Sequence, residues 1–245
     1  MNTIAAILTV YKRNNLDHQI RAVLSQTILP KEIYVWQNES HVDAAIHNDV
    51  LDYAHRLNIK ISHIHSKDKN FKFHGRFSLP LLLNTEYVAI FDDDTIPNPR
   101  WFENCIRVSQ TYNAIAGANG RTIRKDVDEL CTGDGSAVQN DTIVDFVGHC
   151  WFFKREWIHH MWSYSPNTFD NGEDIHFAAS CMIKAGIKCV VPMQPHGDFS
   201  LWGDTHNYLG LDEHATWKKP DHGSVRQQVK DYWINMGWKT INSVQ

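Results

Sequence analysis

The first 91 residues alternate between short apolar runs and segments whose apolar residues recur at helical spacing. Ile4 to Val10 is a continuous apolar run, as expected for a strand that is covered on both faces. The alternation continues with a helix carrying Leu16, Ile20, Val23 and Leu24, a strand over Ile33 to Trp36, a helix carrying Ile46, Val50, Ala54 and Leu57, a strand through Ile59, Ile61 and Ile64, a short helix over Phe77 to Leu83, and a strand over Tyr87 to Phe91. This β-α-β-α-β-α-β order predicts an α/β fold with a mostly parallel sheet, right-handed crossovers and flanking helices.

The pattern is looser in the rest of the chain, although further elements are predicted there. They are a helix over Trp101 to Tyr112, strands over Ala114 to Gly117 and Ile143 to Val147 with a polar stretch from Arg121 to Asp141 between them, an aromatic run Trp151 to Phe153, a short helix over Arg155 to Trp162, a helix over Glu173 to Ala185, a strand over Lys188 to Val191, an irregular segment from Pro192 to Pro220, and a last amphipathic helix with Val225, Val229, Trp233 and Met236. The length favours one domain over residues 1–245.

The composition argues against several classes of protein. A hydrophobic fraction of 42% is enough for a packed core. Lys and Arg number 24 against 28 Asp and Glu, with no basic block, which argues against a nucleic-acid-binding protein. The five cysteines form no Cys-x-x-Cys pair, so a reducing compartment is a simpler interpretation than disulfides or a zinc site. Because the sequence has neither a leader-like start nor the ~20 apolar residues of a transmembrane segment, we expect a cytoplasmic protein.

Three consecutive carboxylates, Asp92, Asp93 and Asp94, follow the apolar strand Tyr87 to Phe91 where that strand is expected to emerge. Like charges side by side cost free energy unless a cation or hydrogen-bond donors neutralise them. Hard oxygen ligands suit Mg²⁺ or Mn²⁺, which hold a substrate's phosphates against one or two carboxylates. An acidic turn in water is the alternative. The apolar strand and a second acidic motif favour a metal–phosphate site.

Polar groups also follow the earlier strands, at Thr9 to Arg13, Gln37 to Glu39 and His63 to Asp68. In open α/β sheets, ligands bind beyond the carboxyl ends of the strands. We therefore expect a nucleotide along this edge, with its base near the first loops and its phosphates near the acidic run. Arg76 is a candidate for a charge-assisted contact with a diphosphate, although a solvated arginine fits the spacing nearly as well.

The second acidic motif, Glu173 and Asp174, follows an Asn-Gly turn at the start of an expected helix. The positive end of the helix dipole favours carboxylates at this position, which would explain them without a function. A carboxylate fixed there is also well placed to accept a proton from an acceptor hydroxyl. His196 is a candidate to complete the metal coordination of the acidic run, in competition with His206 and His214.

These motifs resemble those of glycosyltransferases with the GT-A fold, a Rossmann-like fold that uses nucleotide sugars and a divalent metal. The run Asp92-Asp93-Asp94 is similar to their D-x-D motif, and Gly172-Glu173-Asp174 to their downstream E-D motif. Arg76-Phe77, followed by the acidic run, is particularly similar to the exostosin-like branch. The opening Ile7 to Arg13, with Leu24 to Thr27, resembles family 2 transferases. The resemblance covers roughly residues 3–200.

The resemblance implies a role for each matching residue. The matched nucleotide-sugar-binding residues are Thr9, Tyr11 and Arg13 in the nucleotide loop, Asn38 on the uracil side, Arg76 at the diphosphate, and Asp92 and Asp93 at the ribose and donor sugar. The implied ligands of Mn²⁺ or Mg²⁺ are Asp94 and His196. Glu173 and Asp174 are the implied catalytic residues, with Asp174 as the base.

The activity implied by the resemblance is metal-dependent transfer of a sugar from a UDP-sugar donor to a hydroxyl of a glycan acceptor, with inversion. A nucleotide-binding half is expected at about 1–98, an acceptor-side half at about 99–222 and a C-terminal helix at about 223–238. Two alternatives remain. One is a haloacid-dehalogenase-like phosphatase that uses Mg²⁺, whose D-x-D motif also follows a buried strand. The other is a non-catalytic module that binds a nucleotide or a sugar.

Overall fold

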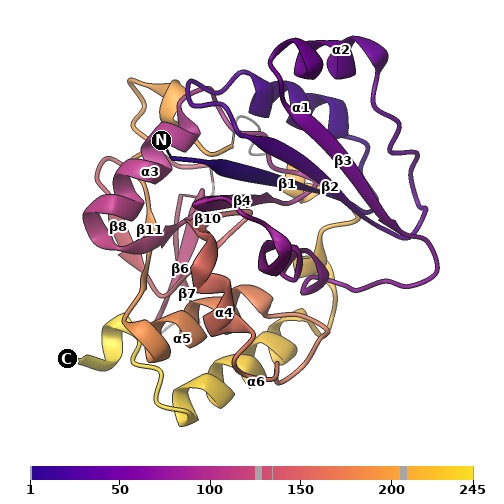
Figure 1. The fold of residues 1–245 in the computed structure, drawn as a ribbon. Coiled ribbons are helices and arrows are strands. Elements are labelled where there is room, and N and C mark those ends of the chain that lie inside the picture. The colour runs from indigo at the N-terminus through magenta and orange to yellow at the C-terminus, as the bar shows by residue number, and fades with distance from the viewer. Residues whose placement is uncertain (1, 125–128, 134, 205–208, 245) are drawn as a thin grey trace.

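A central sheet of eight strands forms the middle layer of the protein. The computed structural model describes residues 2–124, 129–133, 135–204 and 209–244. The strands of the central sheet, in spatial order, are β3 (Lys60–Ser66), β2 (Glu32–Asn38), β1 (Ile4–Val10), β4 (Tyr87–Phe91), β10 (Cys150–Lys154), β5 (Ala114–Ala116), β11 (Lys188–Val191) and β8 (Thr142–Val144). Figure 1 shows this sheet running across the molecule between two layers of helices.

The strand directions confirm the predicted, mostly parallel α/β sheet. β1 pairs in parallel with β2 and β4, β2 with β3, and β5 with β11. β10 is antiparallel to both of its neighbours, β4 and β5, and β8 is antiparallel to β11. Because β1, β2 and β4 are parallel neighbours, the polar residues that follow them meet at one edge of the sheet.

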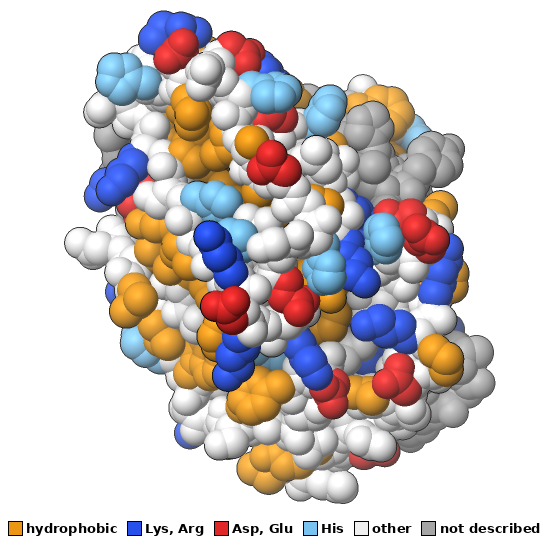
Figure 2. Space-filling view, turned by 90° about the vertical axis from the view of Figure 1, so that its right-hand side faces the viewer, with side chains coloured by type: hydrophobic (Ala, Val, Ile, Leu, Met, Phe, Trp, Pro, Cys, Tyr) orange, Lys and Arg blue, Asp and Glu red, His pale blue; other side chains and the backbone are white. Residues whose placement is uncertain are grey.

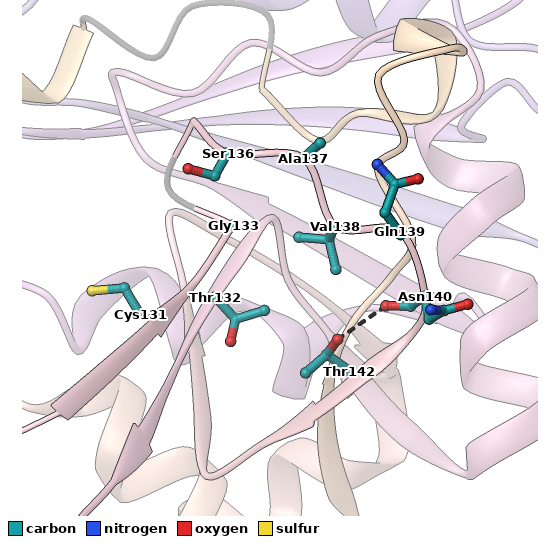
Figure 3. Close-up of a pocket in the computed structure, with 9 residues that line it drawn as sticks. All are labelled: Cys131, Thr132, Gly133, Ser136, Ala137, Val138, Gln139, Asn140 and Thr142. Atoms are coloured by element: carbon teal, nitrogen blue, oxygen red, sulfur yellow. Dashed lines mark hydrogen bonds between the residues drawn. The ribbon is translucent and has the colours of Figure 1, made fainter.

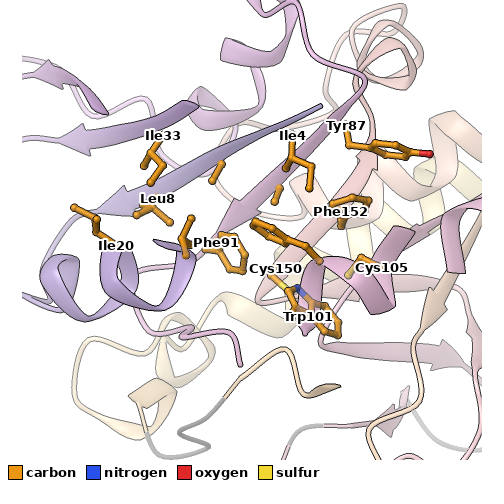
Figure 4. Packing of buried hydrophobic residues seen from close by; sticks show 14 of the residues in the cluster. Ile4, Leu8, Ile20, Ile33, Tyr87, Phe91, Trp101, Cys105, Cys150 and Phe152 are labelled. Carbon is orange, nitrogen blue, oxygen red and sulfur yellow. The ribbon is translucent and has the colours of Figure 1, made fainter. Parts of the chain in front are cut away.

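The helices divide between the two faces of the sheet. They are α1 (Leu16–Leu24), α2 (Asn48–Arg56), α3 (Trp101–Tyr112), α4 (Ile158–Met161), α5 (Glu173–Ala185) and α6 (His222–Asn235). Alternate residues of β1 reach the two hydrophobic cores: Ile4 and Leu8 pack with α1 and α3, whereas Ala5 and Ile7 pack in the core that includes α4, α5 and α6. Figure 4 shows the first of these cores, where Phe91 and Phe152 lie near Trp101.

A second, three-stranded antiparallel sheet lies in the half of the chain that follows the acidic run. Its order is β7 (Glu129–Thr132), β6 (Asn119–Ile123) and β9 (Phe146–Gly148). The stretch 121–141, predicted to separate two strands, therefore contains strand residues of its own; residues 125–128 and 134 within it lie outside the described part of the chain.

The single strand predicted over residues 143–147 divides into β8 and β9, which belong to different sheets. Asp145 separates them, and its carboxylate accepts hydrogen bonds from the backbone N–H groups of Ile123 (2.7 Å) and Ile241 (2.8 Å). The polar side chain thus connects the backbone of β6 to the last part of the chain at the point where one strand would otherwise continue.

The remaining regular segments are short turns of 3₁₀-helix. They are η1 (Gly75–Phe77), η2 (Leu79–Leu82), η3 (Arg155–Trp157), η4 (Phe199–Leu201), η5 (Leu209–Leu211), η6 (Thr216–Lys218) and η7 (Ile241–Val244). The helix predicted over residues 77–83 is thus two 3₁₀ turns, with Pro80, which lacks a backbone N–H, in the second. None of the helices in the described ranges is long and apolar enough to cross a membrane.

Candidate active site

One large cavity of about 940 Å³ opens at the edge of the sheet where β1, β2 and β4 end. Ten of the predicted site residues line it: Thr9, Tyr11, Arg13, Asn38, Arg76, Asp92, Asp93, Asp94, Glu173 and Asp174. Figure 2 shows this side of the molecule, where basic, acidic and histidine side chains gather near the middle of the face. The fold thus brings the two acidic motifs, which are far apart in the sequence, into one site.

Arg76 links the two acidic motifs. It is 6% exposed, and its guanidinium binds Asp92 through Nη1 and Glu173 Oε1 through Nη2, the latter at 3.0 Å. The guanidinium carbon also lies 4.8 Å from the ring centroid of Trp151, at the position of a cation–π contact. A buried cation between two carboxylates lowers the cost of burying all three groups.

Arg13 neutralises the other end of the acidic run. Its Nη1 lies 2.6 Å from Asp93 Oδ1 and 3.2 Å from Asp94 Oδ2. Its Nε and Nη2 donate to the two carboxylate oxygens of Asp212, at 2.7 and 2.8 Å. Burial raises the pKa of Asp93 above its usual value in spite of the Arg13 charge. Arg13 therefore connects the loop after β1 both to the acidic run and to the segment that precedes α6.

Asp174 forms a third ion pair, with Arg226 of α6. Arg226 Nη1 donates to Asp174 Oδ1 at 3.0 Å, and Nη2 donates to Oδ2 at 2.9 Å. The backbone N–H of Ile175 also donates to Oδ1, at 2.8 Å. Burial alone would raise the pKa of Asp174, but the Arg226 charge and its hydrogen bonds outweigh burial and hold the pKa below its usual value.

Glu173 differs from its neighbour in its electrostatic surroundings. Burial and the negative charge of Asp174 raise its pKa to about 7, although Arg76 partly opposes this shift. The two adjacent carboxylates therefore have pKa values that are shifted in opposite directions. Gly172 precedes the acidic pair, and its φ of +81° turns the chain sharply just before α5 begins.

The predicted nucleotide-side residues are held by backbone groups. Thr9 Oγ1 donates to the carbonyl of Phe91 at 2.8 Å, which joins the ends of β1 and β4. Asn38 uses both ends of its amide: Nδ2 donates to the carbonyl of Lys72 at 3.1 Å, and Oδ1 accepts from the N–H of Phe71 at 3.1 Å. Asn38 thus fixes the loop after β3, and the ring of Tyr11 lies beside this loop on the cavity wall.

The residues of this site fit a divalent metal ion that has few protein ligands. No three His, Cys, Asp or Glu side chains are grouped as a metal shell in the part of the chain that the structure describes. Asp94 lies in the cavity, with Oδ1 4.0 Å from His149 Nδ1, whereas His196 is exposed and does not line the cavity. His206 lies outside the described residues. An ion held by Asp94, and otherwise by substrate phosphates and water, fits these residues, whereas a shell of protein ligands alone does not.

Sequence reasoning did not single out Arg226, Asp212 or His149. For Arg226 a signal exists: it precedes Val229 and Trp233 by three and seven residues, so it lies on the apolar stripe of α6, where an arginine needs a partner. No such signal marks Asp212 or His149, because their positions in the site depend on how distant segments pack.

A smaller cavity of about 580 Å³, drawn in Figure 3, shares two lining residues with the main one. Its described lining residues are uncharged: Cys131, Thr132, Gly133, Ser136, Ala137, Val138, Gln139, Asn140 and Thr142. Gly133 and Ser136 line both cavities. Thr142 Oγ1 donates to the carbonyl of Asn140 at 2.9 Å, so one of the hydroxyl groups in this cavity is already engaged.

The fold and the cavity together define a glycosyltransferase of the GT-A class, which uses a nucleotide-sugar donor. Residues 5–162 match the family model of Glycosyl transferase family 2, and the chain belongs to this family. The matched residues include the acidic run and end before Glu173 and Asp174. Family membership supports the transferase over the phosphatase alternative. No curated protein matches the chain.

Proposed function

We propose that this protein is a metal-dependent glycosyltransferase that moves a sugar from a UDP-sugar donor to a hydroxyl of a glycan acceptor, with inversion. The observation that carries the proposal is the shared cavity, in which Arg76 links the acidic run after β4 to the acidic pair at the start of α5. The residues that we propose to bind the diphosphate and to accept the proton thus line the same cavity.

The donor side of the proposal uses the residues that follow β1 and β4. Arg13 and Arg76 line the cavity and would contact the donor diphosphate, because guanidinium groups bind phosphate oxygens well. Asp92 and Asp93 would contact the ribose and the donor sugar. A Mn²⁺ or Mg²⁺ ion held by Asp94 would stabilise the negative charge that develops on the departing diphosphate.

The acceptor side of the proposal uses the acidic pair at the start of α5. Inversion requires the acceptor hydroxyl to attack the anomeric carbon from the face opposite the leaving diphosphate, while a carboxylate takes the hydroxyl proton. Asp174 is the base that the sequence motif predicts, and Glu173 is the other carboxylate of the pair. Both carboxylates line the cavity, so either one is available for comparison by mutation.

The test is a calorimetric titration with UDP, with and without Mn²⁺. We expect binding that requires the metal, and we expect Asp94→Asn to weaken it by roughly tenfold to a hundredfold because a charged ligand is lost. Asp49→Asn is the matched control, because Asp49 is an exposed carboxylate on α2, away from the cavity. Unchanged UDP affinity in Asp94→Asn would show that Asp94 does not bind the metal.

The same titration tests the alternative of a non-catalytic module. Metal-dependent UDP binding without turnover of any UDP-sugar would favour that module. If UDP does not bind in either condition, a UDP-sugar is not the donor of this transferase.

A further inference from the structure

We propose that Trp217 is an acceptor-binding residue, and that its indole ring stacks on a pyranose ring of the acceptor glycan. This inference rests on the proposed function, since it names the part of the acceptor that the same cavity recognises. It starts from a large aromatic side chain that is exposed on the wall of the cavity and not packed in a core.

Trp217 differs from the other tryptophans in its exposure. It is 57% exposed, whereas Trp36 and Trp162 are half-buried and the other six are buried. A single exposed aromatic side chain is ordinary on a protein surface, but this one lines the cavity. Leu211, which is 54% exposed, lines the cavity as well. The two side chains therefore give an otherwise charged cavity an exposed apolar area.

The indole ring of Trp217 is held in place by its neighbours. Its Nε1 donates to the carbonyl of Gly210 at 3.2 Å. Lys218 Nζ lies 5.4 Å from the centroid of the ring and donates to the carbonyl of Leu211. One ammonium group can lie over only one face of a ring, so the opposite face is available to a ligand. A ring that is already fixed loses little conformational entropy when a ligand packs on it, which favours binding.

Two contacts connect Trp217 to the acidic motifs. A Cβ added at Gly210 would lie 3.3 Å from Asp94 Oδ2, so the residue whose carbonyl binds the indole also lies close to the candidate metal ligand. On the other side, η6 packs against α6, whose Arg226 binds Asp174. An acceptor must bring its hydroxyl to the base while the donor is bound. Trp217 lies on the cavity wall that is attached to both partners of this step.

The chemistry of an indole ring favours a sugar on this wall. The faces of aromatic rings carry partial negative charge, and a pyranose presents several weakly positive C–H groups on one face. The hydroxyl groups at the edge of the sugar would remain free to contact polar side chains, and His214 and Lys219 of the same segment line the cavity. Because the donor is expected along the ends of β1, β2 and β4, we assign the wall formed by η6 and α6 to the acceptor.

The experiment measures UDP release from a panel of UDP-sugars with Mn²⁺, in the presence and absence of methyl pyranosides. The pyranosides are those of glucose, galactose, mannose and N-acetylglucosamine. We expect wild-type protein to release UDP faster with at least one of them. Trp217→Ala should raise the KM for that pyranoside by roughly tenfold to a hundredfold, the usual effect of truncating a tryptophan at the centre of a binding surface. Its affinity for UDP with Mn²⁺ should equal that of wild type.

Two further variants separate stacking from other roles. Trp217→Phe keeps an aromatic face and loses the N–H that binds Gly210, so it should raise the KM for the pyranoside much less than Trp217→Ala. Tyr53→Ala is the matched control. Tyr53 is an exposed aromatic residue of α2 with a cation over its ring, Arg56, and it does not line the cavity. This control should have the wild-type KM for the pyranoside.

Three results would overturn the assignment of Trp217. A wild-type KM in Trp217→Ala would show that the ring does not touch the acceptor. Equal losses in Trp217→Phe and Trp217→Ala would show that the N–H matters and the aromatic face does not. A loss of UDP affinity in Trp217→Ala as large as the rise in KM would place the ring on the donor side.

The wild-type protein separates failure of this inference from failure of the proposed function. If it binds UDP with Mn²⁺ but no pyranoside speeds UDP release, the sugar-stacking role is wrong and the transferase proposal stands. If it neither binds UDP nor releases UDP from any UDP-sugar, the proposed function is wrong, and the role of Trp217 with it.

Discussion

Arg76 connects the chemistry of the site to the stability of the protein. Its guanidinium is buried between Asp92 and Glu173 and lies over Trp151. Each of these charges would be costly to bury alone, and each is tolerated because the others are present. Removing the cation should therefore affect folding as well as substrate binding.

We expect Arg76→Met to reduce the free energy of unfolding by ~3–5 kcal/mol, because Glu173 would be left buried, and Asp92 partly buried, without a cation. Urea denaturation at pH 7 measures this change. The control is Arg21→Met, which removes an exposed ion pair whose partners, Arg21 and Asp49, have side chains 48% and 65% exposed. The control should unfold at the wild-type urea midpoint. Equal midpoints for Arg76→Met and wild type would contradict the neutralising role.

Gly172, just before α5, has a backbone conformation that favours glycine, and it lies close to α6. This residue and Gly186 flank the helix, and both have left-handed backbone conformations, with φ of +81° and +64°. A Cβ added at Gly172 would lie 3.0 Å from Cγ2 of Val229 in α6, whereas one added at Gly186 would meet nothing within 4 Å. Alanine at position 186 therefore adds only backbone strain, whereas alanine at position 172 adds backbone strain and a close contact with α6.

We expect Gly186→Ala to cost about 1–2 kcal/mol of stability, the usual strain of a left-handed residue with a Cβ. Gly172→Ala should cost more, because it also forces α6 away from α5, and it should lower turnover by displacing the acidic pair. Urea denaturation and UDP-sugar hydrolysis of the two variants provide the comparison. Similar stability losses, with wild-type turnover in both variants, would show that the α5–α6 contact does not hold the acidic pair in its active position.

Elements with a strong local pattern were predicted well. The expected bounds of α3, α5 and β11 agree with the structure, because apolar periodicity and a left-handed Asn113 or Gly186 mark where the helices end. β6 and β7 were missed because few of their residues are buried, so they lack the alternation that identifies a strand. Pairing with neighbouring strands stabilises them instead.

The candidate site was predictable in part for a related reason. Residues that follow β1 and β4, and the pair that opens α5, stand out because polar groups follow apolar runs. Their partners do not stand out: Arg13 binds Asp212, 199 residues later, and Arg226 binds Asp174 across 52 residues. Tertiary packing determines these pairs, and the spacing of residues in one sequence contains little information about it.

The single domain predicted for residues 1–245 has a testable consequence for unfolding. The central sheet passes without a break from β3 to β8, through both expected halves of the chain. We therefore expect one cooperative unfolding transition in urea, with coincident curves for far-UV circular dichroism and for fluorescence of the nine tryptophans. Two separate transitions would instead indicate two domains.

The antiparallel strand β10 has a consequence for synthesis of the protein. β4 pairs with β1 on one side and with β10 on the other. Roughly 60 residues separate Phe91 from Cys150, so a ribosome that adds about 5–20 residues per second makes β10 about 3–12 seconds after β4. During that interval the nascent chain presents an apolar strand with an open edge, to which another unfinished chain can add. We therefore expect slower elongation over this stretch of the message to favour aggregation of unfinished chains.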